Sequence, residues 1–111
     1  MSLSAKQRIF TRNIGCLIEY AYHIDMELTF GHAWRSIEEQ KRLKAEGKSM
    51  TLKSKHLDRL AVDFNFFING KLTYDKHKIA VLGEYWESLH PDNRWGGNFK
   101  SFIDTPHFEM N

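Results

Sequence analysis

The chain has 111 residues, a length typical of one domain, and 41% of them are hydrophobic, which is enough for a buried core. A formal net charge of +2 is too small to favour a nucleic-acid partner. Cys16 is the only cysteine, which excludes an intrachain disulfide and a cysteine-rich metal site.

No apolar run approaches the roughly 18 residues of a membrane-spanning helix, and the first ten residues lack the apolar segment of a signal peptide. We therefore expect residues 1–111 to form a single domain that is made in the cytoplasm. We also expect a monomer without stable membrane association.

The N-terminal half reads as helix, strand and helix. Residues 4–22 carry apolar side chains at helical spacing, with Ser4 as the expected N-cap, and residues 24–33 alternate like a half-buried strand. Ser36 and Glu39 have the spacing of a capping box, so a second helix is expected to run from there to Gly47.

The C-terminal half begins with a polar, basic loop and then turns to strands. The expected elements are a loop at 47–55, a strand at 60–68, a hairpin turn at Asn69-Gly70, a short returning strand at 71–73, a helix at 75–89 ended by Pro91, a loop with Gly96 and Gly97, and a last strand. This order predicts an α+β fold with helices packed on a small, mainly antiparallel sheet.

Two histidines and one aspartate, His56, Asp63 and His107, could form a catalytic zinc site. Zinc accepts imidazole nitrogen and carboxylate oxygen and keeps a fourth position for water. A strand rises about 3.3 Å per residue, so seven extended residues would hold His56 roughly 23 Å from Asp63. A shared metal therefore demands a sharp turn within residues 57–59.

Two further residues have chemistry that suits such a site. Asp104 could act as general base on a water molecule, and Arg35 could hold developing negative charge or a substrate carboxylate. Each also has a plain structural reading, a turn cap for Asp104 and a surface ion pair for Arg35. Spacing alone leaves both readings open.

The remaining polar features are expected to be structural. The other four histidines belong to no ligand-like group and are expected to be surface or satisfied residues: His23, His32, His77 and His90. Basic residues outnumber acids between Arg35 and Arg59, which indicates a solvated basic surface or, alternatively, one that attracts a carboxylate-rich substrate.

The sequence resembles the M15 metallopeptidases in several ordered segments. The matching segments are Ser54-x-His56-x-x-Arg59-x-Ala61-x-Asp63, similar to the family's SxHxxGxAxD motif; Asp104-x-x-His107, similar to its second motif; Arg35-Ser36 with Gln40 and Gly47, similar to its arginine segment; and Trp95-Gly96-Gly97-x-Phe99, similar to phage and prophage members. Arg59 departs from the family's glycine, which costs strain if the backbone needs positive φ there.

The resemblance implies a fold like that of hedgehog and the D-Ala-D-Ala metallopeptidases. It implies a zinc peptidase that acts on peptidoglycan stem peptides. The implied residues are His56, Asp63 and His107 as zinc ligands, Asp104 as base, Arg35 at the oxyanion or substrate, and Ser54 and Trp95 as substrate-binding residues.

The most similar branch contains the L-alanyl-D-glutamate endopeptidases that phages use as endolysins, because residue 104 is Asp rather than Glu. Such an enzyme would reach the cell wall after release from the cytoplasm. The alternatives are a D-Ala-D-Ala carboxypeptidase and a non-catalytic, zinc-stabilised binding domain.

Overall fold

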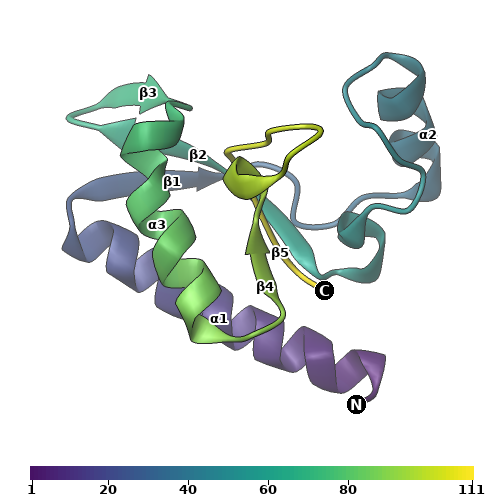
Figure 1. The fold of residues 1–111 in the computed structure, drawn as a ribbon, viewed down its shortest axis with the longest axis horizontal. Helices are drawn as coiled ribbons and strands as arrows, with labels where there is room; N and C mark the ends of the chain where they lie inside the picture. The colour runs from purple at the N-terminus through teal and green to yellow at the C-terminus, as the bar shows by residue number, and fades with distance from the viewer.

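The computed structural model describes residues 1–111 as three α-helices and a five-stranded sheet (Figure 1). The elements are α1 (Leu3–His23), β1 (Met26–Phe30), α2 (Ile37–Ala45), the 3-10 turn η1 (Lys55–Asp58), β2 (Ala61–Ile68), β3 (Lys71–Thr73), α3 (Lys76–Leu89), β4 (Asn93–Trp95), the 3-10 turn η2 (Gly96–Asn98) and β5 (His107–Met110).

Every strand pair is antiparallel. The sheet order is β1-β2-β5-β4, and β3 pairs with β2 through the predicted hairpin, in which Asn69 and Gly70 both have positive φ. The predicted α+β class with a mainly antiparallel sheet is therefore confirmed. The long strand β2 is central because it contacts β1, β3 and β5, and its first half carries Asp63.

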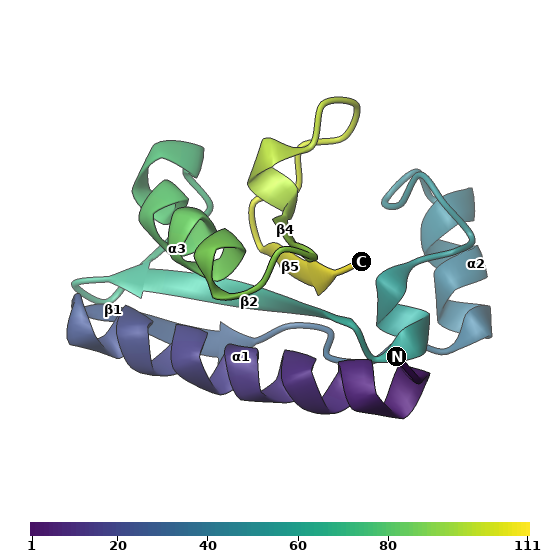
Figure 2. The ribbon, with the colours of Figure 1, turned by 60° about the horizontal axis from the view of Figure 1, so that its bottom comes forward.

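The core lies between the sheet and the helices α1 and α3 (Figure 2). Its largest side chains include Phe66, Trp86, Trp95 and Phe108, all at most 2% exposed. The Trp86 indole donates hydrogen bonds to the carbonyls of Arg94 and Glu109, which ties α3 to β4 and β5. None of the helices combines the length and the apolar character that a bilayer crossing requires.

Two N-terminal boundaries differ from expectation. α1 begins at Leu3 rather than after Ser4, because the Ser2 hydroxyl accepts a hydrogen bond from the Ala5 amide and so caps the helix. β1 begins only at Met26, because Asp25 has a φ of 64° and this left-handed residue interrupts the extended backbone.

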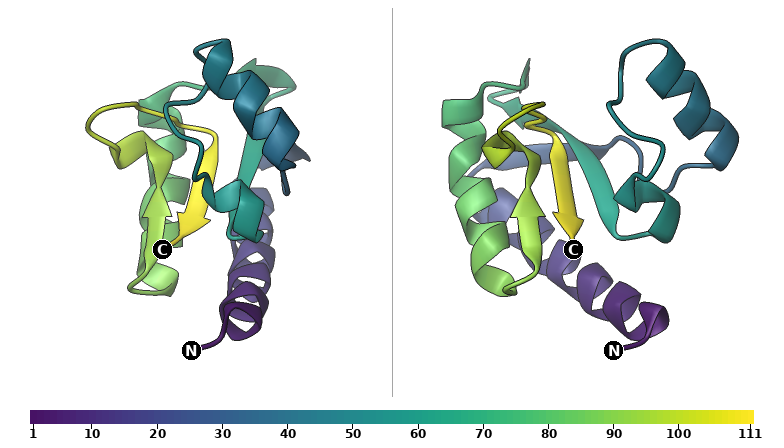
Figure 3. Two further views of the ribbon diagram at one scale, coloured as in Figure 1. Left: turned by 90° about the vertical axis from the view of Figure 1, so that its right-hand side faces the viewer. Right: turned by 45° about the vertical axis from the view of Figure 1, so that its right-hand side comes forward.

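α2 stands apart from the rest of the fold, and the return segment 46–54 runs beside it (Figures 1 and 3). Ser36 caps it as predicted, since its hydroxyl accepts from the Glu39 amide at 3.0 Å. The Glu39 carboxylate pairs with Arg42 instead of completing a reciprocal capping box. Gly47, with a φ of 74°, follows the end of the helix and turns the chain back.

Candidate active site

The turn η1 brings His56 back against β2. Arg59 has φ 56° and ψ 36°, a left-handed conformation that reverses the chain between η1 and the strand. His56 Nε2 consequently lies 3.2 Å from Asp63 Oδ1. The predicted sharp turn within residues 57–59 is confirmed, and Arg59 does occupy a backbone conformation that favours glycine.

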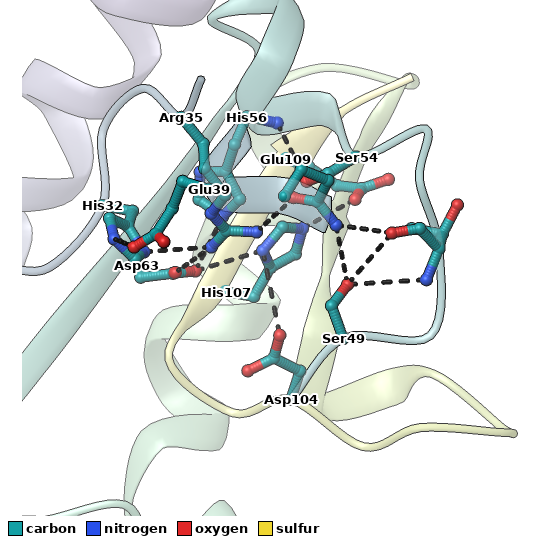
Figure 4. Close-up of polar contacts among 12 residues, drawn as sticks. His32, Arg35, Glu39, Ser49, Ser54, His56, Asp63, Asp104, His107 and Glu109 are labelled. Atoms are coloured by element: carbon teal, nitrogen blue, oxygen red, sulfur yellow. Dashed lines mark hydrogen bonds and ion pairs between the residues drawn. The ribbon is translucent and has the colours of Figure 1, made fainter. Parts of the chain in front are cut away.

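His107 reaches the same carboxylate from the neighbouring strand. It begins β5 directly opposite Asp63 in the antiparallel register, and its Nδ1 lies 3.1 Å from Asp63 Oδ1. One ligand atom from each of His56, Asp63 and His107 lies within 4.8 Å of the others (Figure 4). The structure therefore brings together the three residues that the sequence proposes as ligands.

This donor set fits a zinc ion. Two imidazole nitrogens and one carboxylate oxygen are ligands that zinc prefers, and both histidines are nearly buried. His107 Nε2 lies 2.7 Å from Glu109 Oε1, so a neutral ring with its proton on Nε2 presents the Nδ1 lone pair towards the ligand group. Sequence reasoning missed Glu109, although its position two residues after His107 on a strand places both side chains on one face.

Burial and mutual contacts shift the pKa values of these groups. Burial alone would raise the pKa of Asp63, but hydrogen bonds from His107 and His56 hold it well below its usual range. Burial would lower the pKa of His107, but its bonds to Asp63 and Glu109 prevail and raise it to about 9. Burial lowers the pKa of His56 despite its contact with Asp63. The metal-free group thus holds a carboxylate anion beside a protonated His107.

Asp104 stands next to the ligand group at the cleft wall. Its Oδ2 lies 3.9 Å from His107 Nδ1, and burial, opposed by His107, raises the pKa of its carboxyl. The backbone amide of Asp104 donates to the Gly96 carbonyl at 2.9 Å. A Cβ on Gly96 would lie 2.2 Å from the Asp104 carbonyl oxygen, so only a glycine allows the two backbone segments to approach this closely.

Arg35 is buried rather than a surface residue. Its Nη2 donates to Asp63 Oδ2 at 3.3 Å and lies 3.1 Å from His32 Nδ1, while its Nη1 donates to Gln40 Oε1 at 2.8 Å. Only 8% of Arg35 is exposed, so the alternative reading as a weak surface ion pair does not describe it. His32, expected to be a surface or satisfied histidine, contacts Arg35 and also lines the cleft.

A cleft of about 590 Å³ opens over these side chains. Segments 48–55 and 101–107 supply most of its walls, with Phe99 beside them. Ser54 lines the cleft, and its hydroxyl accepts a hydrogen bond from the His56 amide at 3.2 Å. Lys48, Lys53 and Lys55 also line it, so part of the predicted basic surface faces the cleft.

Trp95 occupies a different place from the one expected for a substrate-binding residue. Its side chain is buried at 2% exposure and does not line the cleft above the histidines. Its indole nitrogen donates to the Thr105 carbonyl at 2.8 Å. The structure gives Trp95 a supporting position beneath the segment that carries Asp104 and His107.

The comparisons with known proteins agree with this geometry. Residues 47–110, more than half of the chain, match the M15 family described as D-alanyl-D-alanine carboxypeptidase. Comparison with curated proteins gives no match.

Two solved structures share the fold. The L-Ala D-Glu endopeptidase ChiX of Serratia marcescens is 24% identical with a TM-score of 0.77, over 92% of this chain and 77% of that one. The vancomycin-resistance D,D-pentapeptidase VanY, in complex with Zn(II), is 15% identical with a TM-score of 0.64, over 91% of this chain and 70% of that one. The chain therefore belongs to the M15 peptidase family and is a hydrolase of cell-wall peptides.

Proposed function

We propose that this chain is a zinc-dependent endopeptidase that cuts the L-alanyl-D-glutamate bond of peptidoglycan stem peptides. His56 Nε2, Asp63 and His107 Nδ1 would hold the ion, and Asp104 and Arg35 would serve the reaction around it. The convergence of three ligand atoms beside Asp104 in an open cleft carries the proposal.

Each residue has a distinct task in this mechanism. When bound, zinc would supply a Lewis acid for the scissile carbonyl and the attacking water. Asp104 would serve as the general base for the attacking water and then as the acid that protonates the leaving amine. Arg35 fixes the orientation of Asp63 and places positive charge beside the carbonyl oxygen on which negative charge develops.

The engagement of Arg35 favours an endopeptidase over a carboxypeptidase. A carboxypeptidase needs a cation for the free terminal carboxylate of its substrate, and both terminal nitrogens of Arg35 already contact Gln40, His32 and Asp63. The lysines that line the cleft are Lys48, Lys53 and Lys55. The endopeptidase ChiX is also the better structural match of the two relatives, with a TM-score of 0.77 against 0.64.

A D-Ala-D-Ala carboxypeptidase that uses Lys48, Lys53 or Lys55 for the terminal carboxylate is the alternative within the family. A non-catalytic zinc-stabilised domain is the alternative from another class. The position of Asp104 beside the ligand group argues against it, because a structural zinc site has no use for a general base. Use as a phage endolysin, with residues 1–111 as one catalytic domain, stays a prediction.

Digestion of purified peptidoglycan tests the proposal. The parent chain, Asp104→Asn and the matched control Asp92→Asn, an exposed aspartate outside the cleft, would be compared with chelator and after zinc is restored. We expect new L-alanine carboxyl ends and D-glutamate amino ends from the parent and the control. These products should disappear with chelator, return with zinc, and be absent for Asp104→Asn.

Each other outcome selects a different reading. Release of single D-alanine residues would establish the carboxypeptidase. Stoichiometric zinc binding without cleavage would establish the binding domain. Unchanged cleavage by Asp104→Asn would show that Asp104 is not the base, whichever bond is cut.

A further inference from the structure

We propose that Gln40 is a positioning residue that couples Arg35 to the cleft segment 48–53, an inference that rests on the peptidase function proposed above. Gln40 lies on α2 and touches no ligand atom itself. It is 1% exposed, although α2 is otherwise mostly hydrophilic and buries only one other residue, Leu43. An amide at such a position costs free energy unless its hydrogen bonds are made.

The Gln40 amide makes hydrogen bonds in two directions. On one side its Oε1 accepts from Arg35 Nη1 at 2.8 Å. On the other side its Nε2 donates to Ser49 Oγ at 2.9 Å and to the Thr51 carbonyl at 2.5 Å. Both amide protons and one acceptor position are thus used, which makes Gln40 a bridge between two parts of the cleft.

One end of this bridge leads to the proposed metal site. Arg35 donates from Nη2 to Asp63 Oδ2, so a displacement of its guanidinium moves the partner of a ligand carboxylate. Nη1 has Gln40 as its hydrogen-bond partner, and the buried Nε has none. Gln40 therefore sets the rotation of the guanidinium plane relative to Asp63.

The other end leads to the cleft wall. Ser49, Met50 and Thr51 line the cleft. The backbone of this segment is otherwise tied to α2 by two hydrogen bonds to the Leu43 carbonyl, from the amides of Lys48 and Ser49. Beyond Ser49 the bond from Gln40 to the Thr51 carbonyl is what joins the segment to α2. Gln40 thus orders a wall that a substrate peptide contacts.

Only an amide of this length can serve both ends. A glutamate at position 40 would still accept from Arg35, but it could not donate to Ser49 Oγ or the Thr51 carbonyl. A methionine has nearly the same length and makes neither set of hydrogen bonds. The two substitutions therefore separate the wall contact from the Arg35 contact.

The test compares Gln40→Glu, Gln40→Met, Ser49→Ala and the control Lys41→Met, an exposed neighbour on the same helix. Steady-state kinetics on a soluble stem peptide would give kcat and KM separately. Limited trypsin digestion, read by mass spectrometry at Lys48 and Lys53, reports the order of the wall without any need for activity. Zinc affinity by chelator competition reports the state of the ligand group.

We expect trypsin to cut at Lys48 and Lys53 faster in Gln40→Glu and Ser49→Ala than in the parent. Both variants should also have a higher KM for the stem peptide, by about tenfold for Gln40→Glu, while kcat changes less than about threefold. Gln40→Met should show the same KM effect and also lower kcat by about tenfold or more, because Arg35 is released. Zinc affinity should fall for Gln40→Met, in which Arg35 is released, and should stay close to that of the parent for Gln40→Glu and Ser49→Ala. Lys41→Met should match the parent in every measurement.

The proposal would be overturned if Gln40→Met had the same kcat and KM as the parent. It would also be overturned if trypsin cut Gln40→Glu at Lys48 and Lys53 no faster than it cuts the parent. If Gln40→Met does not fold, Gln40→Glu and Ser49→Ala still decide the wall contact. If the parent chain cleaves no stem peptide, the peptidase function fails while the digestion and zinc measurements still decide the bridge.

Discussion

Glu109 controls the protonation of His107 in the metal-free protein. The Glu109 carboxylate lies 2.7 Å from His107 Nε2, and together with Asp63 it raises the pKa of His107 to about 9 against the lowering effect of burial. The unfolded chain has an ordinary histidine pKa near 6.5. The contact therefore stabilises the folded state fully below about pH 6.5, and this stabilisation is lost as the pH rises through about 9.

Glu109→Gln should consequently destabilise the chelator-treated protein in a pH-dependent way. We expect a loss of about 1 to 2 kcal/mol in the free energy of unfolding near pH 6 and a much smaller loss near pH 10, since one pKa unit corresponds to about 1.4 kcal/mol. Urea unfolding of parent and variant at both pH values measures the difference. An equal loss at both pH values would mean that Glu109 acts through packing and not through the charge on His107.

Arg59 combines an unfavourable backbone conformation with a favourable side-chain contact. Its left-handed backbone disfavours any side chain with a Cβ, but its guanidinium lies 5.0 Å from the centre of the Trp34 ring. We expect Arg59→Ala, which keeps the strain and loses the cation–π contact, to be about 1 kcal/mol less stable than Arg59→Gly. Thermal unfolding of the two variants decides the order, and an alanine variant as stable as the glycine variant would contradict it.

At the scale of elements, the packing of α3 on β4 depends on Gly83. An ideal Cβ at this position would lie 2.2 Å from two atoms of the buried Trp95 ring. Gly83→Ala should therefore force α3 away from β4. We expect it to lower the free energy of unfolding by about 3 kcal/mol or more, at or above the upper end of the usual cost of overpacking. Gly15→Ala in α1, where nothing lies within 4 Å, is the matched control and should be neutral or stabilising. Chemical unfolding of both variants measures the contrast.

Most elements could be predicted because their signals are local. The spacing of apolar residues in α1, α3 and β2, the Ser36 cap and the Asn69-Gly70 turn all act within a few residues of chain. The buried position of Trp95 could not be predicted, because it depends on Gly83, twelve positions earlier, which leaves room for the ring to pack inward. A sequence with aromatic residues beside glycines does not show which ring fills the core and which lines a cleft.

The candidate site could likewise be predicted only in part from the sequence. The motifs supplied His56, Asp63, His107, Asp104 and Arg35, and spacing alone demanded the turn at residues 57–59. Gln40 belongs to the segment that resembles the family's arginine segment, and Glu109 shares a strand face with His107, but neither pattern shows which atoms these side chains or His32 contact. Gln40 meets Ser49 and Thr51 because the chain turns back after α2 at Gly47, and His56 meets Asp63 because η1 and Arg59 reverse the chain before β2.

At the scale of the whole molecule, zinc should stabilise the fold because its proposed ligands come from η1, β2 and β5. Binding to the folded state alone at 100 times the dissociation constant stabilises a protein by about 2.7 kcal/mol. We expect the thermal midpoint to rise when zinc is added to the chelator-treated parent and to rise far less for His107→Ala. Differential scanning calorimetry at fixed free zinc measures both, and an equal rise in both proteins would place the ion elsewhere.

The same binding should be strongly dependent on pH. His107 must lose its proton before Nδ1 can bind a metal, and its pKa in the metal-free protein is raised to about 9, whereas that of His56 is lowered. Between about pH 7 and 9, zinc therefore displaces one proton from His107, and its affinity should increase about tenfold per pH unit. Calorimetric titration in buffers of different ionisation enthalpy counts the proton released.

Glu109→Gln, which brings the pKa of His107 down, should release clearly less than one proton at pH 8. A full proton released by that variant would show that Glu109 does not govern how His107 binds the ion.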